Sequence, residues 1–231
     1  MNVIKRVKEE IRLVRERDPA IKSSWEVLLY PSFHAILAYQ VSHAMYLKKH
    51  YFLARLISQK SARRTGIEIH PGATIGKRLF IDHGNGVVIG ETAIVGDDVT
   101  LYQGVTLGGT GKETGKRHPT IGNHVMISAG ARIIGSFRVG DNSKIGAGSV
   151  VLSEVPPNST VVGVPGRIVK RDNIKIHWEE PDYAQLKQRV IELETMLGKI
   201  LTISDQGDLC DEMGLRKNVF CIYKESSKTA S

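Results

Sequence analysis

The chain has few cysteines and no long apolar stretch. Only Cys210 and Cys221 occur among its 231 residues, so we expect no disulfide framework and no CxxC metal pair. No apolar run approaches the roughly 18 residues that a membrane-spanning helix needs, and the first residues carry no signal-peptide pattern. We therefore expect a cytoplasmic protein with free thiols and no membrane segment.

Positive charge is concentrated in the N-terminal part of the chain. Residues 1–66 hold thirteen Lys and Arg against five Asp and Glu, whereas the whole chain has a formal net charge of +8. The basic residues are interspersed with acidic ones and no recognition motif accompanies them. We expect no nucleic-acid partner.

An aliphatic residue returns at nearly every sixth position through the middle of the chain. The thirteen positions are Ile69, Ile75, Ile81, Ile89, Val95, Leu101, Leu107, Ile121, Ile127, Ile133, Val139, Ile145 and Val151. A period of six fits neither a helix nor a lone strand, but is typical of a parallel β-helix in which each six-residue unit forms one side of a coil. Three units make a triangular coil of about 18 residues with the aliphatic side chains pointing inward.

The period breaks twice, and both breaks contain polar, titratable residues. The spacing is eight between Ile81 and Ile89, and fourteen between Leu107 and Ile121. A solenoid accommodates such insertions as surface loops, where binding and catalytic residues collect. We therefore expect the insertions 82–86 and 108–119 to mark one functional face.

Helical patterns flank the repeats. Residues 2–17 have helical spacing that ends at Asp18-Pro19, and a second helical stretch runs from Pro31 to about Arg64. A further helix is expected over 182–201, where Leu186, Val190, Leu193, Leu197 and Ile200 form a short heptad-like seam. The predicted organisation is a helical N-terminal domain (1–66), the β-helix (67–171) and a C-terminal helix with a tail (172–231).

Five ordered motifs resemble those of the serine O-acetyltransferase family. They are IEIHPGA (67–73), IDHGNGVVIGET (81–92), VTLGGTGK (105–112), RHP (117–119) and GAGSVV (146–151), closed by GVPGR (163–167). The resemblance covers about residues 10–171 and includes RDPA at 17–20 and FHA at 33–35. It implies a left-handed β-helix that transfers acetyl from acetyl-CoA to the hydroxyl of L-serine, the first step of cysteine synthesis, without a metal.

The resemblance also implies roles for individual residues. His83 would be the general base, because a histidine with a pKa near 6.5 suits proton abstraction at neutral pH. Glu68 would orient His83 and stabilise the imidazolium, although Asp is also common at this position in the family. The backbone N–H of Gly109 would stabilise the tetrahedral oxyanion.

The same resemblance implies which residues bind the substrates. Asp82 and Asp18 would meet the ammonium group of serine, and Arg117 with His118 would meet its carboxylate, for which the planar guanidinium is suited. Asp18 could equally serve only to end the first helix. The CoA arm would run past Gly109, Ala129, Ala147 and Gly148, and the CoA phosphates would meet Lys144, Lys170 or Arg171. His34, His43, His70 and His124 are expected to be structural.

Two other enzyme classes share this solenoid. A hexapeptide acetyltransferase that acts on a sugar or xenobiotic hydroxyl would lack the clamp of Asp82, Arg117 and His118. A γ-carbonic-anhydrase-like metalloenzyme would use three histidines, for which His83, His118 and His124 are the candidates, but His83 lies in an inserted loop rather than in a regular strand. A purely structural or binding protein would have no use for the polar insertions.

The family resemblance implies an oligomer with active sites between adjacent solenoids. A homotrimer is the minimum, and a hexamer is the alternative, although only about 66 residues precede the repeats. L-cysteine would be the feedback inhibitor, competing at the serine site. A complex with O-acetylserine sulfhydrylase is not expected, because the chain ends in Ser231 rather than in the isoleucine that several family members use.

Overall fold

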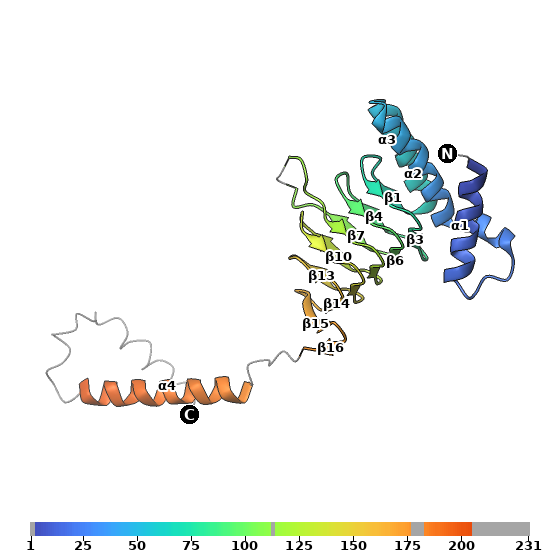
Figure 1. Cartoon of the computed structure of the whole chain (residues 1–231). Coiled ribbons are helices and arrows are strands. Elements are labelled where there is room, and N and C mark those ends of the chain that lie inside the picture. The colour runs from blue at the N-terminus through green and yellow to red at the C-terminus, as the bar shows by residue number, and fades with distance from the viewer. Residues whose placement is uncertain (1–2, 112–113, 177–182, 205–231) are drawn as a thin grey trace. The chain divides into compact units, whose positions relative to one another are not determined.

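A computed structural model describes residues 3–111, 114–176 and 183–204. The chain divides into two compact units, residues 1–177 and residues 178–231. The first unit holds three α-helices and all the described strands, and the second holds one helix (Figure 1).

The N-terminal helices differ from the sequence prediction in one respect. Helix α1 (Val3–Arg17) was expected, and a short 3-10 helix η1 (Ser24–Leu29) follows it. The single helical stretch expected from Pro31 is in fact two helices, α2 (Pro31–Leu47) and α3 (Tyr51–Thr65). The break lies at Lys49, whose left-handed φ of 66° interrupts the helical hydrogen bonds and turns the chain back on itself.

The repeats form a parallel β-helix with three faces. Face A contains β1 (Glu68–Ile69), β4 (Val88–Ile89), β7 (Thr106–Gly108), β10 (Arg132–Ile134) and β13 (Val150–Val151). Face B contains β2 (Thr74–Ile75), β5 (Ile94–Val95), β8 (Thr120–Ile121) and β11 (Arg138–Val139). Face C contains β3 (Phe80–Ile81), β6 (Thr100–Leu101), β9 (Met126–Ile127), β12 (Lys144–Ile145) and β14 (Ser159–Val162), and ends in antiparallel β15 (Arg167–Arg171) and β16 (Ile174–Lys175).

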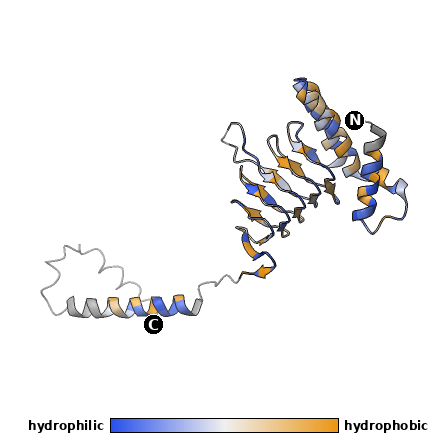
Figure 2. Ribbon diagram, in the orientation of Figure 1, coloured by the Kyte–Doolittle hydropathy of each residue, from blue (hydrophilic) through white to orange (hydrophobic). Residues whose placement is uncertain are grey.

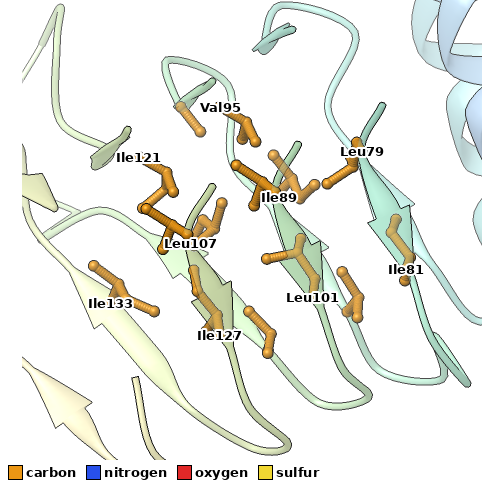
Figure 3. Packing of buried hydrophobic residues seen from close by; sticks show 14 of the residues in the cluster. Leu79, Ile81, Ile89, Val95, Leu101, Leu107, Ile121, Ile127 and Ile133 are labelled. Carbon is orange, nitrogen blue, oxygen red and sulfur yellow. The ribbon is translucent and has the colours of Figure 1, made fainter. Parts of the chain in front are cut away.

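The predicted inward column is the core of this β-helix. Twelve of the thirteen repeat positions are buried in one continuous cluster, and Ile75 is partly buried and packs against it. Figure 3 shows side chains such as Ile89, Leu107 and Ile133 from successive coils stacked in the interior. Because each coil pairs in register with the next, for example Ile89 with Leu107 and Leu107 with Ile133, the aliphatic residues align along the solenoid axis.

Close stacking explains why a glycine follows many repeat positions. A Cβ added at Gly76 would lie 2.8 Å from the backbone carbon of Gly96, and one added at Gly96 would lie 2.8 Å from that of Gly122. These glycines are therefore required by the close approach of successive coils rather than by a positive φ.

The helices cover the first coils of the solenoid. Tyr39 Oη in α2 donates a hydrogen bond to the carbonyl of Ala73 at 2.7 Å, and Ser58 Oγ in α3 donates to that of Ile69 at 2.7 Å. A second small core joins α1, η1 and α2 to face C; its buried members are Leu13, Val14, Val27, Phe33 and Phe80. In Figure 1 the three helices lie at the end of the β-helix where β1 and β3 begin the stack.

The second unit contains helix α4 (Tyr183–Ser204), which confirms the helix expected over 182–201. Both hydrophobic and hydrophilic residues appear along it in Figure 2. The seam residues Leu186, Val190, Leu193 and Leu197 are all exposed, while the side chain of Ile200 and both cysteines lie outside what the structure describes. None of the described helices is long and apolar enough to cross a membrane.

Candidate active site

Two edges of the β-helix carry the candidate residues. At the C–A edge the chain passes from face C to face A, and at the A–B edge it passes from face A to face B. The first insertion lies on the C–A edge between β3 and β4, and the second lies on the A–B edge between β7 and β8. The expectation of one functional face is therefore wrong for a single chain, because face A separates the two insertions.

The first insertion displays His83 to solvent. The connection between β3 and β4 takes residues 82–87, two more than the connection 102–105 in the next coil. His83 itself has a left-handed φ of 57°. This backbone conformation is uncommon for residues other than glycine, and it is found more often at functional sites. Its side chain is 72 % exposed, and its Nε2 lies 3.9 Å from Asp82 Oδ1.

Asp18 joins this group through Tyr30. Tyr30 Oη donates a hydrogen bond to Asp18 Oδ2, and the Ala20 N–H donates to Asp18 Oδ1 at 2.8 Å. The hydrogen bond from Tyr30 has the largest effect on the pKa of Asp18 and lowers it, and the Ala20 N–H lowers it further. The charge of His83 acts in the same direction. In turn the Asp18 carboxylate raises the pKa of Tyr30 to about 12, with a smaller contribution from Asp82. The end of α1 thus supplies a carboxylate near Asp82 and His83.

Three of the predicted CoA-contacting residues lie farther along the same C–A edge. Ala129 belongs to the connection 128–131, and Ala147 and Gly148 belong to the connection 146–149. Backbone hydrogen bonds stack these connections, since Gly148 N–H donates to the Ala129 carbonyl at 2.8 Å. Cβ atoms added at Gly130 or Gly148 would meet no atom within 4 Å, so the edge is open along this line.

The second insertion brings Arg117 and His118 back against the A–B edge. Arg117 Nη2 donates a hydrogen bond to Glu91 Oε2 at 2.6 Å, and Glu91 Oε1 accepts one from Tyr46 Oη at 3.2 Å. Burial raises the pKa of Glu91, but the Arg117 bond, the nearby His70 and the Tyr46 bond together bring it below its ordinary value. No other hydrogen bond joins the Arg117 side chain to the described residues, which leaves most of its donors for a ligand.

Glycines make room for this second group. The ring of His118 lies over Gly90, where a Cβ would come within 2.1 Å of His118 Nε2. A Cβ at Gly109 would lie 3.0 Å from the Arg117 carbonyl oxygen, so the strand end and the returning loop are in close contact. Gly109 therefore lies on the A–B edge with Arg117 and His118, not beside His83.

Glu68 does not contact His83 within the chain. It begins β1 on face A, and its Oε1 accepts hydrogen bonds from Arg55 Nη2 at 3.3 Å and Gln59 Nε2 at 3.4 Å. Both partners come from α3, which packs beside β1. The expected contact between Glu68 and His83 is thus absent within one chain. The carboxylate that pairs with the His83 imidazole there is that of Asp82.

Comparison with known proteins decides the family. A family model described as bacterial transferase hexapeptide (six repeats) matches residues 118–153. A serine acetyltransferase of Bacillus subtilis is 56 % identical over 202 residues, which cover 83 % of this chain and 93 % of the relative. The chain belongs to the serine acetyltransferase family.

Solved serine acetyltransferases have the same fold. The Neisseria gonorrhoeae enzyme in complex with serine is 46 % identical with a TM-score of 0.69, over 72 % of this chain and 69 % of that one. The Brucella abortus enzyme in complex with coenzyme A is 46 % identical with a TM-score of 0.69, over 71 % and 66 %. A complex with cysteine is 45 % identical with a TM-score of 0.70, over 73 % and 66 %.

Lys144 lies away from the C–A edge, on face C. It pairs in register with Thr160, which pairs with Lys170, so that the two lysines line one pocket of about 460 Å³. The polar residues Asn142, Asn158, Ser159, Thr160, Asp172 and Asn173 complete the lining. An anionic group could be held there, because two ammonium groups face the same space.

Sequence reasoning gave no role to three residues that hold candidate site residues in place. Tyr30 holds Asp18, Glu91 holds Arg117, and Thr92 holds His118. Glu91 and Thr92 lie inside the motif at 81–92, but the periodicity gives no sign that they contact a loop 26 residues away. Tyr30 had only one local signal, its position before the Pro31 that begins α2.

Three of the other histidines, His34, His43 and His70, are held by structural contacts. His43 Nδ1 is hydrogen-bonded to the Pro71 carbonyl at 2.7 Å, and His34 Nε2 to that of Leu28 at 2.8 Å. His70 Nδ1 accepts the Gly72 N–H at 3.0 Å. Across the described ranges no three His, Cys, Asp or Glu side chains are grouped so that they could hold a metal ion.

Proposed function

We propose that this chain transfers the acetyl group of acetyl-CoA to the hydroxyl of L-serine, giving O-acetyl-L-serine and CoA. The observation that carries the proposal is that Asp82 and His83 share the C–A edge, with the Asp18 carboxylate close enough to feel the charge of His83. The open line of Ala129, Ala147 and Gly148 follows along the same edge. Relatives bound to serine and to coenzyme A support both substrates.

His83 acts as the general base. Its exposed imidazole removes the proton of the serine hydroxyl as the oxygen attacks the thioester carbonyl. The tetrahedral intermediate then expels the CoA thiolate, and the imidazolium returns the proton to this sulfur, so that proton and charge balance. Asp82 and Asp18 hold the ammonium of serine, and their negative charge also favours the transient imidazolium.

Arg117 and His118 bind the serine carboxylate, and the backbone N–H of Gly109 donates to the oxyanion. These three residues lie on the A–B edge, whereas His83 lies on the C–A edge of the same chain. We infer that the A–B edge of a second copy closes over the C–A edge of the first, in a homotrimer. Glu68 lies on face A between the edges, so its role in orienting a base also depends on that second copy.

Cysteine inhibits by occupying the serine site in this proposal. It has the same ammonium and carboxylate as serine, so the same clamp accepts it, and a relative has been solved in complex with cysteine. Lys144 and Lys170 on face C are assigned to a CoA phosphate, because they are the cationic side chains of the polar pocket there.

A thiol-release assay tests the function. Purified protein with acetyl-CoA is offered L-serine, L-homoserine, a sugar panel and chloramphenicol, and free CoA is measured. We expect release with serine to exceed release with every other acceptor. Preferred acetylation of a sugar or of chloramphenicol would contradict the proposal, and loss of activity on chelation would favour the metalloenzyme alternative.

A further inference from the structure

Thr92 is the centre of four hydrogen bonds at the A–B edge. Its Oγ1 accepts the backbone N–H of Arg117 at 3.0 Å and that of His118 at 3.1 Å. The same oxygen lies 2.9 Å from His118 Nδ1, and the Thr92 backbone N–H lies 3.1 Å from this nitrogen. One threonine thus fixes both the path of the returning loop and the ring of His118.

The donors and acceptors in this network allow one arrangement of protons. A backbone N–H can only donate, so His118 Nδ1 must accept from Thr92 and carries no proton. The Thr92 hydroxyl oxygen already accepts two backbone N–H groups, which leaves its hydrogen to point at Nδ1, whose single lone pair is then shared by the two Thr92 donors. A neutral imidazole in this setting has its single proton on Nε2.

We propose that Thr92 is a positioning residue that keeps His118 neutral with its proton on Nε2, so that His118 acts on the substrate only as a hydrogen-bond donor. The proposal rests on the proposed function, in which His118 and Arg117 face the serine carboxylate. It assigns the two site histidines different tasks: His83 exchanges a proton, and His118 does not.

The surroundings of His118 agree with this role. The residue is only 7 % exposed, and its Nε2 makes no hydrogen bond to the described residues, so this donor is available to a ligand. The charged groups around the ring are Arg117, Lys116 and Glu91, and His70 is also near. Burial lowers the pKa of His118, Arg117 and Lys116 lower it further, and Glu91 alone raises it.

Protonation of Nδ1 would turn an acceptor into a donor that faces two other donors. Both hydrogen bonds from Thr92 would be lost in a largely buried site, where unpaired donors are costly. Holding His118 in the Nε2–H form, which we call the tautomer lock, has a catalytic benefit as well. A histidine with a free Nε2 lone pair near the serine hydroxyl would compete with His83 for the proton, and the Nε2–H form has no such lone pair.

Nuclear magnetic resonance of the ring nitrogens directly tests which nitrogen of His118 carries the proton. The full chain is labelled with ¹⁵N at histidine, the His118 signals are assigned by their absence in His118→Gln, and long-range ¹H–¹⁵N spectra are recorded from pH 8 to pH 5. We expect unmodified His118 to be neutral, with the proton on Nε2, over most of this range. A dominant Nδ1–H form, or an imidazolium at neutral pH, would overturn the proposal.

Two substitutions of Thr92 separate the hydroxyl from the side-chain volume. Thr92→Val removes the hydroxyl donor and acceptor but keeps the branched shape, whereas Thr92→Ser keeps the hydroxyl and is the matched control. We expect Thr92→Val to raise the pKa of His118 and to lower kcat/KM for serine by roughly three- to tenfold, the usual worth of one hydrogen bond. Thr92→Ser should resemble the unmodified protein in both measurements, and KM for acetyl-CoA should not change.

The outcomes are distinguishable. Equal kinetics and equal spectra for the Val and Ser variants would show that Thr92 does not position His118. If Thr92→Val fails to fold, the spectra of the unmodified protein and of Thr92→Ser still decide the protonation state. If the unmodified protein does not acetylate serine, the proposed function fails, while the spectra continue to test the lock.

Discussion

At the scale of single residues, the two site histidines have opposite surroundings. The His83 side chain is 72 % exposed, and its Nε2 lies 3.9 Å from a carboxylate oxygen of Asp82. His118 is buried over Gly90 and has a neighbouring arginine and lysine. The difference comes from the loops, since one insertion projects outward while the other folds back onto its edge.

Removal of the base should have the largest kinetic effect. His83→Ala is expected to lower kcat by roughly 10²- to 10⁴-fold, the usual contribution of a general base, with acetyl-CoA binding nearly unchanged. Glu68→Gln should cause a smaller loss, because in the chain this carboxylate is held by Arg55 and Gln59. Near-normal turnover of His83→Ala in the thiol-release assay would remove His83 from the mechanism.

The carboxylate clamp makes a prediction about selectivity. Arg117→Lys keeps the charge but loses the planar fork, so KM for serine should rise by roughly ten- to a hundredfold while KM for acetyl-CoA changes little. The matched control is Arg138→Lys, an exposed arginine paired with Asp141 on face B. An unchanged KM for serine, or equal competition by serine methyl ester, would contradict the clamp.

One buried and one partly buried histidine, His118 and His70, should make the fold sensitive to mild acid. Burial lowers the pKa values of His70 and His118 below the ordinary 6.5. Between the folded and the unfolded pKa the unfolded chain binds more protons, so the free energy of unfolding falls as the pH drops below about 6.5 and is unaffected above it.

Thermal unfolding at pH 7.5 and pH 5.5 measures this effect. The Tm should be lower at pH 5.5, and the difference should shrink in His70→Asn, whose amide oxygen can still accept the Gly72 N–H. The carboxylates with lowered pKa values, such as Asp18 and Asp98, titrate below this window and do not contribute to it. A Tm that is equal at both pH values would contradict the assignment.

At the scale of elements, α4 presents an apolar seam that needs a partner. Leu186 and Leu193 are 54 % and 60 % exposed, whereas most of the stability of a helix in a protein comes from packing of its apolar face. The heptad-like spacing suits packing against the same helix of other copies. We therefore expect α4 to be protected by self-association in the oligomer.

Limited trypsin digestion tests this expectation at Lys187 and Arg189, which lie within α4. Leu193→Asp should be cut at these sites several times faster than the unmodified protein, since the seam would bury a charge. Glu192→Asp introduces the same residue off the seam and should be cut at the normal rate. Equal cleavage of all three proteins would show that α4 does not self-associate.

At the scale of the whole molecule, the proposed site is divided between two edges, and we expect a second copy of the chain to complete it. His83→Ala and Arg117→Ala should each be inactive as homotrimers. The two variants are then denatured together in equal amounts and refolded. Each edge of a shared site comes from an intact copy with a probability of about one half, so both edges are intact in about one site in four. About a quarter of normal activity should therefore return.

No recovery would mean that one chain supplies both halves of each site. Light scattering on the same samples should give about three times the chain mass of 25.5 kDa, with a hexamer as the alternative. A fully active monomer would contradict the shared site.

The sequence by itself determined the solenoid and its inward column, and it supplied the candidate residues of the site. The thirteen aliphatic positions suffice for this because burial of one residue per six is a local rule that each coil obeys independently. The two insertions were equally visible, since a break in a strict period stands out. The single break between α2 and α3 was not visible, because residues on both sides of Lys49 are compatible with a helix.

Only the tertiary structure decided where these residues meet. Coil stacking places Thr92 against His118 and Glu91 against Arg117 across 26 residues, and Tyr30 reaches Asp18 across 12. Such partners depend on which edge each loop leaves and on the direction in which it folds back, which the periodicity does not specify. The separation of His83 from Arg117 by face A has the same origin, because a triangular coil puts successive connections on different edges.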